Sequence, residues 1–74
     1  MEYTILIHEA DECGYWAEIS ALPGCFSQGE TIEETIRNTK EAILLHIESL
    51  KEEGQPVPVE ENIVATVKVV ISAA

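Results

Sequence analysis

Lysine and arginine are scarce in this sequence: the 74 residues hold four of them against fourteen Asp and Glu, a formal net charge of −10. A surface with so few cations is poorly suited to neutralising phosphates, which argues against direct binding to nucleic acid or to an anionic membrane. A basic protein partner fits better, because opposite net charges speed the encounter of two proteins and orient it.

Long apolar runs are absent as well. The first apolar stretch, residues 3–7, is too short for a signal peptide and follows no basic segment. No run approaches the roughly 20 apolar residues that a membrane-spanning helix needs. We therefore expect a cytoplasmic protein that does not enter a membrane.

Cysteine is sparse too, with Cys13 and Cys25 outside any CxxC spacing. Two thiols are too few to hold a metal ion without other ligands. We expect both to stay reduced, as is usual in the cytosol, and no metal or other cofactor to be bound. Because Cys25 precedes a strand rather than opening a helix, we expect it to be a small buried side chain.

The short length limits the core. Seventy-four residues allow one domain, which we expect to span 1–74, and 46% hydrophobic residues are typical of a globular chain. A chain of this size buries only about 60–65% of the surface that its unfolded form exposes. Association is therefore a source of extra stability, and we expect a homo-oligomer, a dimer or larger.

Three short segments have the composition of β-strands. Residues 2–9 are rich in β-branched side chains, residues 15–20 alternate between two faces, and residues 25–27 follow a tight turn. Gly14 allows the positive φ that closes a hairpin, and Gly24, after a proline, suits the second turn. These signals predict an antiparallel three-strand meander.

A helix is predicted over residues 31–53. Thr31 and Glu34 have the spacing of a capping box, and Gly54 suits the C-terminal cap. Leu45 projects among glutamates, either as an isolated exposed leucine or as a contact residue. Apolar side chains at helical spacing predict one buried stripe on the opposite side. They are Ile32, Ile36, Ile43, Ile47 and Leu50.

Residues 62–72 are predicted to form a last strand, because they are almost continuously apolar and β-branched. The order is then β-β-β-α-β, an α+β fold in which a right-handed crossover brings the last strand parallel to the first. The helix stripe covers the face of the sheet that carries the odd-numbered residues. Nothing in the chain covers the other face.

The uncovered face is predicted to be the binding surface for a protein partner. It is half apolar and carries the single tryptophan, a composition typical of protein interfaces. The acidic hairpin beside it would steer a basic partner. The expected partner-binding residues are Leu6, His8, Glu9, Asp11, Glu12, Trp16, Glu18 and Lys68.

Catalysis has little support in the sequence. A magnesium ion needs two or three converging carboxylate oxygens, but most of the hairpin carboxylates lie in or beside a solvated turn. The two histidines, His8 and His46, lie on different elements, and no Ser or Cys is paired with either by spacing. We therefore expect no catalytic residue, and a residual metal-dependent nuclease is the least favoured interpretation.

The connection between the third strand and the helix carries a specific motif. Residues 21–36 read ALPGCFSQGETIEETI and are followed by Asn38 and by Glu-Ala-Ile at 41–43. This run resembles the pattern found at the same place in the HicB-like antitoxin family, and Gly-Tyr-Trp-Ala at 14–17 is similar to that family too. One departure is Thr35, where the family more often has alanine, a difference that concerns helix packing only.

The resemblance implies a partial ribonuclease H-like fold with the fourth strand beside the first, and no nuclease activity. In the family this domain binds and masks a small basic messenger-RNA-cleaving toxin of the HicA type. A further C-terminal DNA-binding segment then represses the operon. Only two residues follow the predicted last strand, so we expect this chain to lack that segment.

These observations lead to a primary hypothesis and an alternative from another class. The first is a non-catalytic antitoxin-like interaction module for a basic HicA-like toxin. The alternative is an orphan homo-oligomeric regulatory domain without a toxin, in which the strongly β-forming last strand pairs with its own copy.

Overall fold

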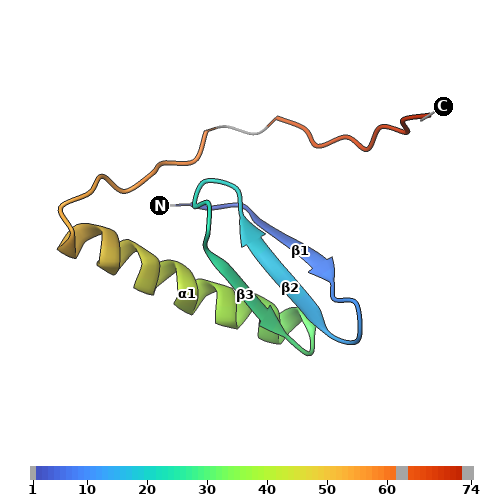
Figure 1. Ribbon diagram of the computed structural model, residues 1–74, viewed down its shortest axis with the longest axis horizontal. Helices are drawn as coiled ribbons and strands as arrows, with labels where there is room; N and C mark the ends of the chain where they lie inside the picture. The colour runs from blue at the N-terminus through green and yellow to red at the C-terminus, as the bar shows by residue number, and fades with distance from the viewer. Residues whose placement is uncertain (1, 62–63, 73–74) are drawn as a thin grey trace.

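Three antiparallel strands and one helix make up the computed structural model, which describes residues 2–61 and 64–72 (Figure 1). The strands are β1 (Ile5–Glu9), β2 (Tyr15–Ile19) and β3 (Phe26–Gly29), and the helix is α1 (Ile32–Glu52). The strands pair in the order β1-β2-β3. The predicted meander followed by a helix is confirmed.

Two glycines shape the turns as their positions predicted. Gly14 has φ of 79°, and its carbonyl accepts a hydrogen bond of 3.0 Å from the amide of Ala10, which closes the first hairpin. Gly24 has φ of 86° in the turn before β3. A residue with a Cβ atom rarely adopts such a positive φ, so both turns need glycine.

Helix α1 is capped at both ends. Thr31 is the N-cap, and its hydroxyl accepts a hydrogen bond of 3.0 Å from the amide of Glu34. At the other end the amides of Gly54 and Gln55 donate to the carbonyls of Lys51 and Leu50, and Gly54 has φ of 71°. This is a Schellman termination. Among the described residues, no helix is long and apolar enough to cross a membrane.

The buried face of α1 agrees in part with the predicted stripe, because Ile36, Ile43, Ile47 and Leu50 are half-buried. Its most deeply buried residues are Thr35 and Thr39, both fully inaccessible, whereas Ile32 is exposed. The face is rotated toward the threonines because their hydroxyls lose no hydrogen bond on burial. Thr35 donates to the carbonyl of Thr31 at 2.7 Å, and Thr39 donates to that of Thr35 at 2.6 Å.

The threonines are buried because the helix lies very close to β3. A Cβ placed on Gly29 would lie 2.7 Å from both the amide nitrogen and the hydroxyl oxygen of Thr35. Only glycine permits this approach, and only small side chains fit beneath it. The helix consequently packs chiefly against β3, less against β2 and least against β1.

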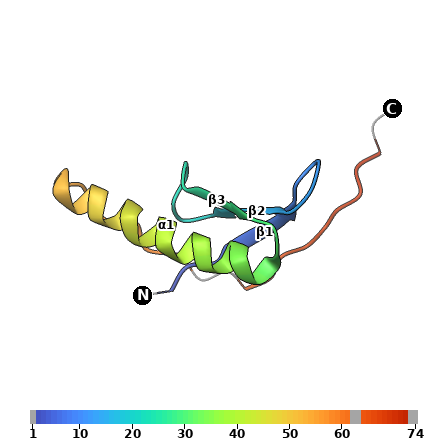
Figure 2. The same cartoon turned by 90° about the horizontal axis from the view of Figure 1, so that it is seen from below.

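The core lies between the sheet and the helix, as Figure 2 shows. Ala17, Ile19, Leu22 and Cys25 are its buried apolar residues. Odd-numbered strand residues therefore face the helix, as predicted, and Cys25 is a small buried side chain, also as predicted. Burial raises the pKa of the Cys25 thiol. Cys13 is exposed, and neither cysteine forms a disulfide.

The predicted fourth strand over 62–72 is not present in this structure. Residues 64–72 have no regular secondary structure, and positions 62 and 63 lie outside the described residues. The segment runs clear of the sheet (Figure 1) and its side chains are exposed. A β-forming sequence is not sufficient for a strand, because the ladder hydrogen bonds need a neighbouring strand. Within residues 2–61 and 64–72, β2 is the only strand that pairs with β1.

We expect Gly29→Ala to lower the free energy of unfolding by about 1–3 kcal/mol, because the added methyl group collides with the backbone of Thr35. Urea denaturation followed by far-UV circular dichroism measures the change. Gln28→Ala, at an exposed neighbouring position, is the control and should change stability by about 0.5 kcal/mol or less. Equal midpoints for the two variants would contradict the close-approach interpretation.

Candidate protein-interaction surface

The face of the sheet opposite α1 carries an aromatic cluster built from all three strands. The register places His8 opposite Trp16 and Glu18 opposite Phe26. The His8 and Trp16 rings stack with centroids 4.3 Å apart and planes inclined by 26°, and Phe26 lies 6.2 Å from Trp16 at 53°. We call His8, Trp16, Glu18 and Phe26 the outer-face cluster.

A carboxylate completes the outer-face cluster. Glu18 Oε2 lies 2.8 Å from His8 Nε2, and both side chains are more than one-third exposed. Such an exposed pair contributes little to stability. Its effect is positional: the histidine lies between the carboxylate and the indole, so an acidic group is held at the edge of an aromatic surface.

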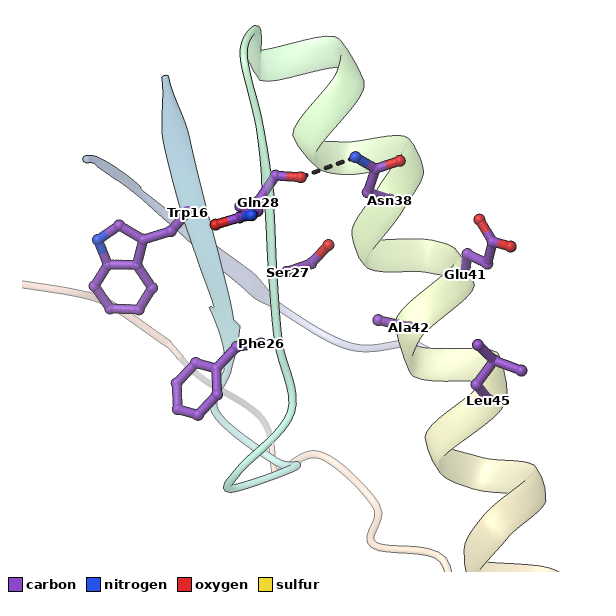
Figure 3. A pocket seen from close by; sticks show the side chains of 8 residues that line it. All are labelled: Trp16, Phe26, Ser27, Gln28, Asn38, Glu41, Ala42 and Leu45. Carbon is purple, nitrogen blue, oxygen red and sulfur yellow. Dashed lines mark hydrogen bonds between the residues drawn. The ribbon is translucent and has the colours of Figure 1, made fainter. Parts of the chain in front are cut away.

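The exposed edge of β3 joins this cluster to the helix. Figure 3 shows Trp16 and Phe26 on one side of the strand and Asn38 and Leu45 on the other. We call this surface depression the β3 groove. Its lining residues are Trp16, Phe26, Ser27, Gln28, Asn38, Glu41, Ala42 and Leu45.

One contact within the β3 groove limits how another chain can bind there. Asn38 Nδ2 donates a hydrogen bond of 2.8 Å to the carbonyl of Gln28, so one acceptor on the strand edge is already occupied by the helix. Edge strands with free backbone groups are sites of unwanted strand pairing. The groove therefore favours recognition by side chains over simple extension of the sheet.

The chemistry of this surface suits a cationic protein side chain. Aromatic faces attract Arg and Lys through the ring quadrupole, and a nearby carboxylate adds a charge-assisted hydrogen bond. Trp16 and Phe26 supply the faces, and Glu18 and Glu41 supply the carboxylates. Leu45 adds an apolar contact, since its side chain is 61% exposed.

The structure brings together some of the predicted partner-binding residues. Leu6, His8, Trp16 and Glu18 lie on the same face, since their register partners alternate along β1 and β2. The remaining predicted acidic residues lie outside this face. Glu9, the last residue of β1, alternates to the side of Ile5 and Ile7, and Asp11 and Glu12 are exposed in the turn.

Lys68 is not part of this face. The prediction placed it there as part of a fourth strand, but it lies in the exposed segment 64–72, which forms no strand. Conversely, the sequence interpretation missed Phe26 as a site residue. The alternation across the third strand could have identified it, because Phe26 occupies the same face as Trp16 once the turn length is known.

Residues 2–61 and 64–72 contain no candidate metal-binding site. Those residues contain no group of three His, Cys, Asp or Glu side chains placed to hold an ion. Glu9, Asp11 and Glu12 are exposed at the end of the β1–β2 hairpin. What the surface offers is an aromatic and acidic area for another protein.

Comparisons with known proteins agree on one family. The model of the HicB_like antitoxin of bacterial toxin-antitoxin systems matches residues 3–70. The UPF0150 protein ssr1765 of Synechocystis sp. is 48% identical over 69 residues, which cover 93% of this chain and 87% of that protein.

Solved structures give the same result. The N-terminal domain of the Burkholderia pseudomallei antitoxin HicB matches with a TM-score of 0.74 and 41% identity, over 86% of this chain and 75% of that one. A chain of the HicA3 and HicB3 toxin-antitoxin complex matches with a TM-score of 0.71 and 27% identity, over 84% and 72% of the two chains. At these scores the arrangement of three strands and a helix is shared.

We expect Trp16→Ala to lower the free energy of unfolding by only about 1 kcal/mol, because the indole contacts other rings on the outer face and not the core. Leu22→Ala, by contrast, empties a fully buried site and should cost about 2–5 kcal/mol. Urea denaturation of both variants checks this order. Equal or reversed losses would mean that Trp16 is a core residue.

Proposed function

This chain belongs to the HicB-like antitoxin family, and from that premise we propose that it is a non-catalytic antitoxin that binds and masks a small basic RNA-cleaving toxin of the HicA type. The observation that carries the proposal is the outer-face cluster, an aromatic and acidic surface that nothing among the described residues covers. The solved HicA3 and HicB3 complex supports a toxin of this type as the partner.

Electrostatics supports a basic partner. The net charge of −10 attracts a cationic protein over distances up to about a Debye length, roughly 10 Å at 0.1 M salt. Glu9, Asp11 and Glu12 are exposed at the end of β1 and in the first hairpin turn, where they raise the association rate. Specific contact then depends on the desolvated aromatic side chains, since tryptophan is enriched among residues that dominate binding energy.

The β3 groove and the outer-face cluster also indicate where the toxin would bind on this chain. We place its main contact on Trp16, Phe26 and Leu45 along the β3 groove, with Glu18 and the hairpin carboxylates at the rim. Lys68 is left outside this contact, because it does not reach the outer face in the structure. The chain would act in the cytoplasm, where the messenger RNA that such a toxin cleaves is found.

We also propose an architecture for the whole chain. Residues 1–74 act as a single domain of partial ribonuclease H-like architecture, and the last segment becomes a fourth strand beside β1 when it is paired. The chain works as a homo-oligomer.

The alternative function is a homo-oligomeric regulatory domain without a toxin. The observation that favours it is the exposed, β-forming segment 64–72, which offers pairing to another copy independently of any toxin. Calorimetry with the toxin separates the alternatives, because only the antitoxin binds it.

Binding to a purified HicA-type toxin encoded in the same genome tests the proposal. Trp16→Ala and Leu45→Ala should each weaken the affinity measured by calorimetry at least tenfold, because each removes an apolar contact in the β3 groove. Raising the salt concentration should weaken the wild-type complex, mainly through a slower association rate.

Leu44→Ala is the matched control. Leu44 is next in sequence to Leu45 and equally exposed, at 64% against 61%, but it lies on the side of the helix toward β1. Its affinity for the toxin should be unchanged. Failure of the wild-type chain to bind the toxin would refute the antitoxin proposal, and equal losses from Leu44→Ala and Leu45→Ala would refute the assignment to the β3 groove.

A further inference from the structure

Among the residues of β1, β2 and β3, Glu18 is the single carboxylate on the outer face of the sheet. The register pairs it with Leu6 on β1 and with Phe26 on β3, and Trp16 lies two residues away on the same face. Aromatic and apolar side chains therefore surround one negative charge. A partner that covers the outer-face cluster removes this charge from water, which is costly unless a cation accompanies it.

His8 can supply that cation only when its ring is protonated. Its Nε2 lies 2.8 Å from Glu18 Oε2, and because an ionised carboxylate only accepts hydrogen bonds, Nε2 carries a proton in either charge state of the ring. The other ring nitrogen, Nδ1, decides the charge. Histidine is the side chain that changes charge between about pH 5 and pH 8. Among the described residues, no lysine or arginine lies within salt-bridge distance of Glu18.

The elements packed around His8 bring no other titratable group to the outer face. Glu9 and its register partner Tyr15 alternate to the helix side of the sheet, and β3 contains no titratable side chain. Helix α1, with its acidic and basic residues, lies on the opposite face (Figure 2). The acidic side chains of the first hairpin turn lie past the ends of β1 and β2. Glu18 is therefore the charged group that faces His8.

With His8 neutral, the outer-face cluster offers a position for one guanidinium group. The histidine engages Oε2 of Glu18, which leaves Oε1 as an acceptor. Phe26 lies opposite Glu18 on the neighbouring strand, is 61% exposed, and points to the same side of β3 as Trp16 (Figure 3). A planar guanidinium can donate to the carboxylate and stack on an aromatic ring at the same time, whereas an ammonium group is a compact, strongly hydrated charge. The cluster therefore favours arginine over lysine.

With His8 protonated, the same position is already satisfied from within the chain. The imidazolium lies 2.8 Å from the Glu18 carboxylate and stacks on Trp16 with ring centroids 4.3 Å apart. It thus uses both the negative charge and the aromatic face that attract a guanidinium. A second cation beside it would meet a like charge in a desolvated contact, which is strongly unfavourable. Protonation of His8 and binding of an arginine therefore oppose each other.

We propose that Glu18 receives one arginine of the toxin and that protonation of His8 competes with this arginine. The inference rests on the proposed function and adds the type of toxin residue and the pH dependence of its binding. Linkage makes the competition reciprocal: a fall in pH protonates His8 and weakens the complex, and formation of the complex releases a proton from His8. The affinity is therefore highest above the pH range in which histidine titrates and declines through that range.

Calorimetry of the full chain with the purified toxin tests the competition. The wild-type affinity should be about tenfold lower at about pH 5.5 than at about pH 7.5, because histidine changes from mostly neutral to mostly protonated between these values. His8→Gln should lose most of this dependence, since its amide can still donate to Glu18 but carries no charge. His46→Gln, at the other histidine of the chain, on α1, is the control and should keep it. Near the middle of this range, in buffers of different ionisation enthalpy, the wild type should release more protons on binding than His8→Gln.

Glu18→Gln should weaken binding about tenfold or more at about pH 7.5, whereas Glu61→Gln, the same change at an exposed linker position, should have little effect. Among single arginine-to-glutamine variants of the toxin, one should lose affinity that Glu18→Gln does not reduce further. The same pH dependence in the wild type and His8→Gln, or no toxin arginine coupled to Glu18, would overturn the inference while the antitoxin proposal stands. A wild-type chain that binds no toxin at either pH would refute both.

Discussion

The contact between Gly29 and Thr35 is the constraint on which the rest of the architecture depends. It lets α1 approach β3 so closely that a single methyl group would not fit. The helix is therefore offset toward one edge of a three-strand sheet instead of being centred on it. Two surfaces stay incomplete as a result: the helix side of β1 and the whole outer face of the sheet.

The offset also explains the choice of residues in the core. Beneath a close backbone approach there is room for threonine and alanine but not for isoleucine, and a threonine on a helix can satisfy its hydroxyl by donating to the preceding turn. Thr35 and Thr39 do this. The longer isoleucines are used further along the helix, where Ile43 reaches the cluster of Ile19, Leu22 and Cys25.

Local signals in the sequence were sufficient for the meander, the turns and the helix caps, because each depends on a few neighbouring residues. The buried face of α1 was predicted in part, since Ile36, Ile43, Ile47 and Leu50 are half-buried. The fully buried Thr35 and Thr39 were missed, because hydropathy cannot register a close approach to Gly29. The fourth strand was predicted from composition, but a strand also needs a partner. For the candidate site, alternation identified Trp16 and Glu18, and the same alternation applied to residues 25–27 would have identified Phe26, which the register places opposite Glu18.

The β3 groove and the free edge of β1 lie at opposite edges of the sheet. The β3 groove and its acidic rim lie on one side, where a cationic protein finds aromatic faces and carboxylates. On the other side lies the β1 edge, next to a depression lined by Glu2, Tyr3, Ile5, Lys40, Ile43 and Leu44. Because the β3 groove and the depression at β1 share no lining residue, a partner that occupied the β3 groove would leave the β1 edge accessible.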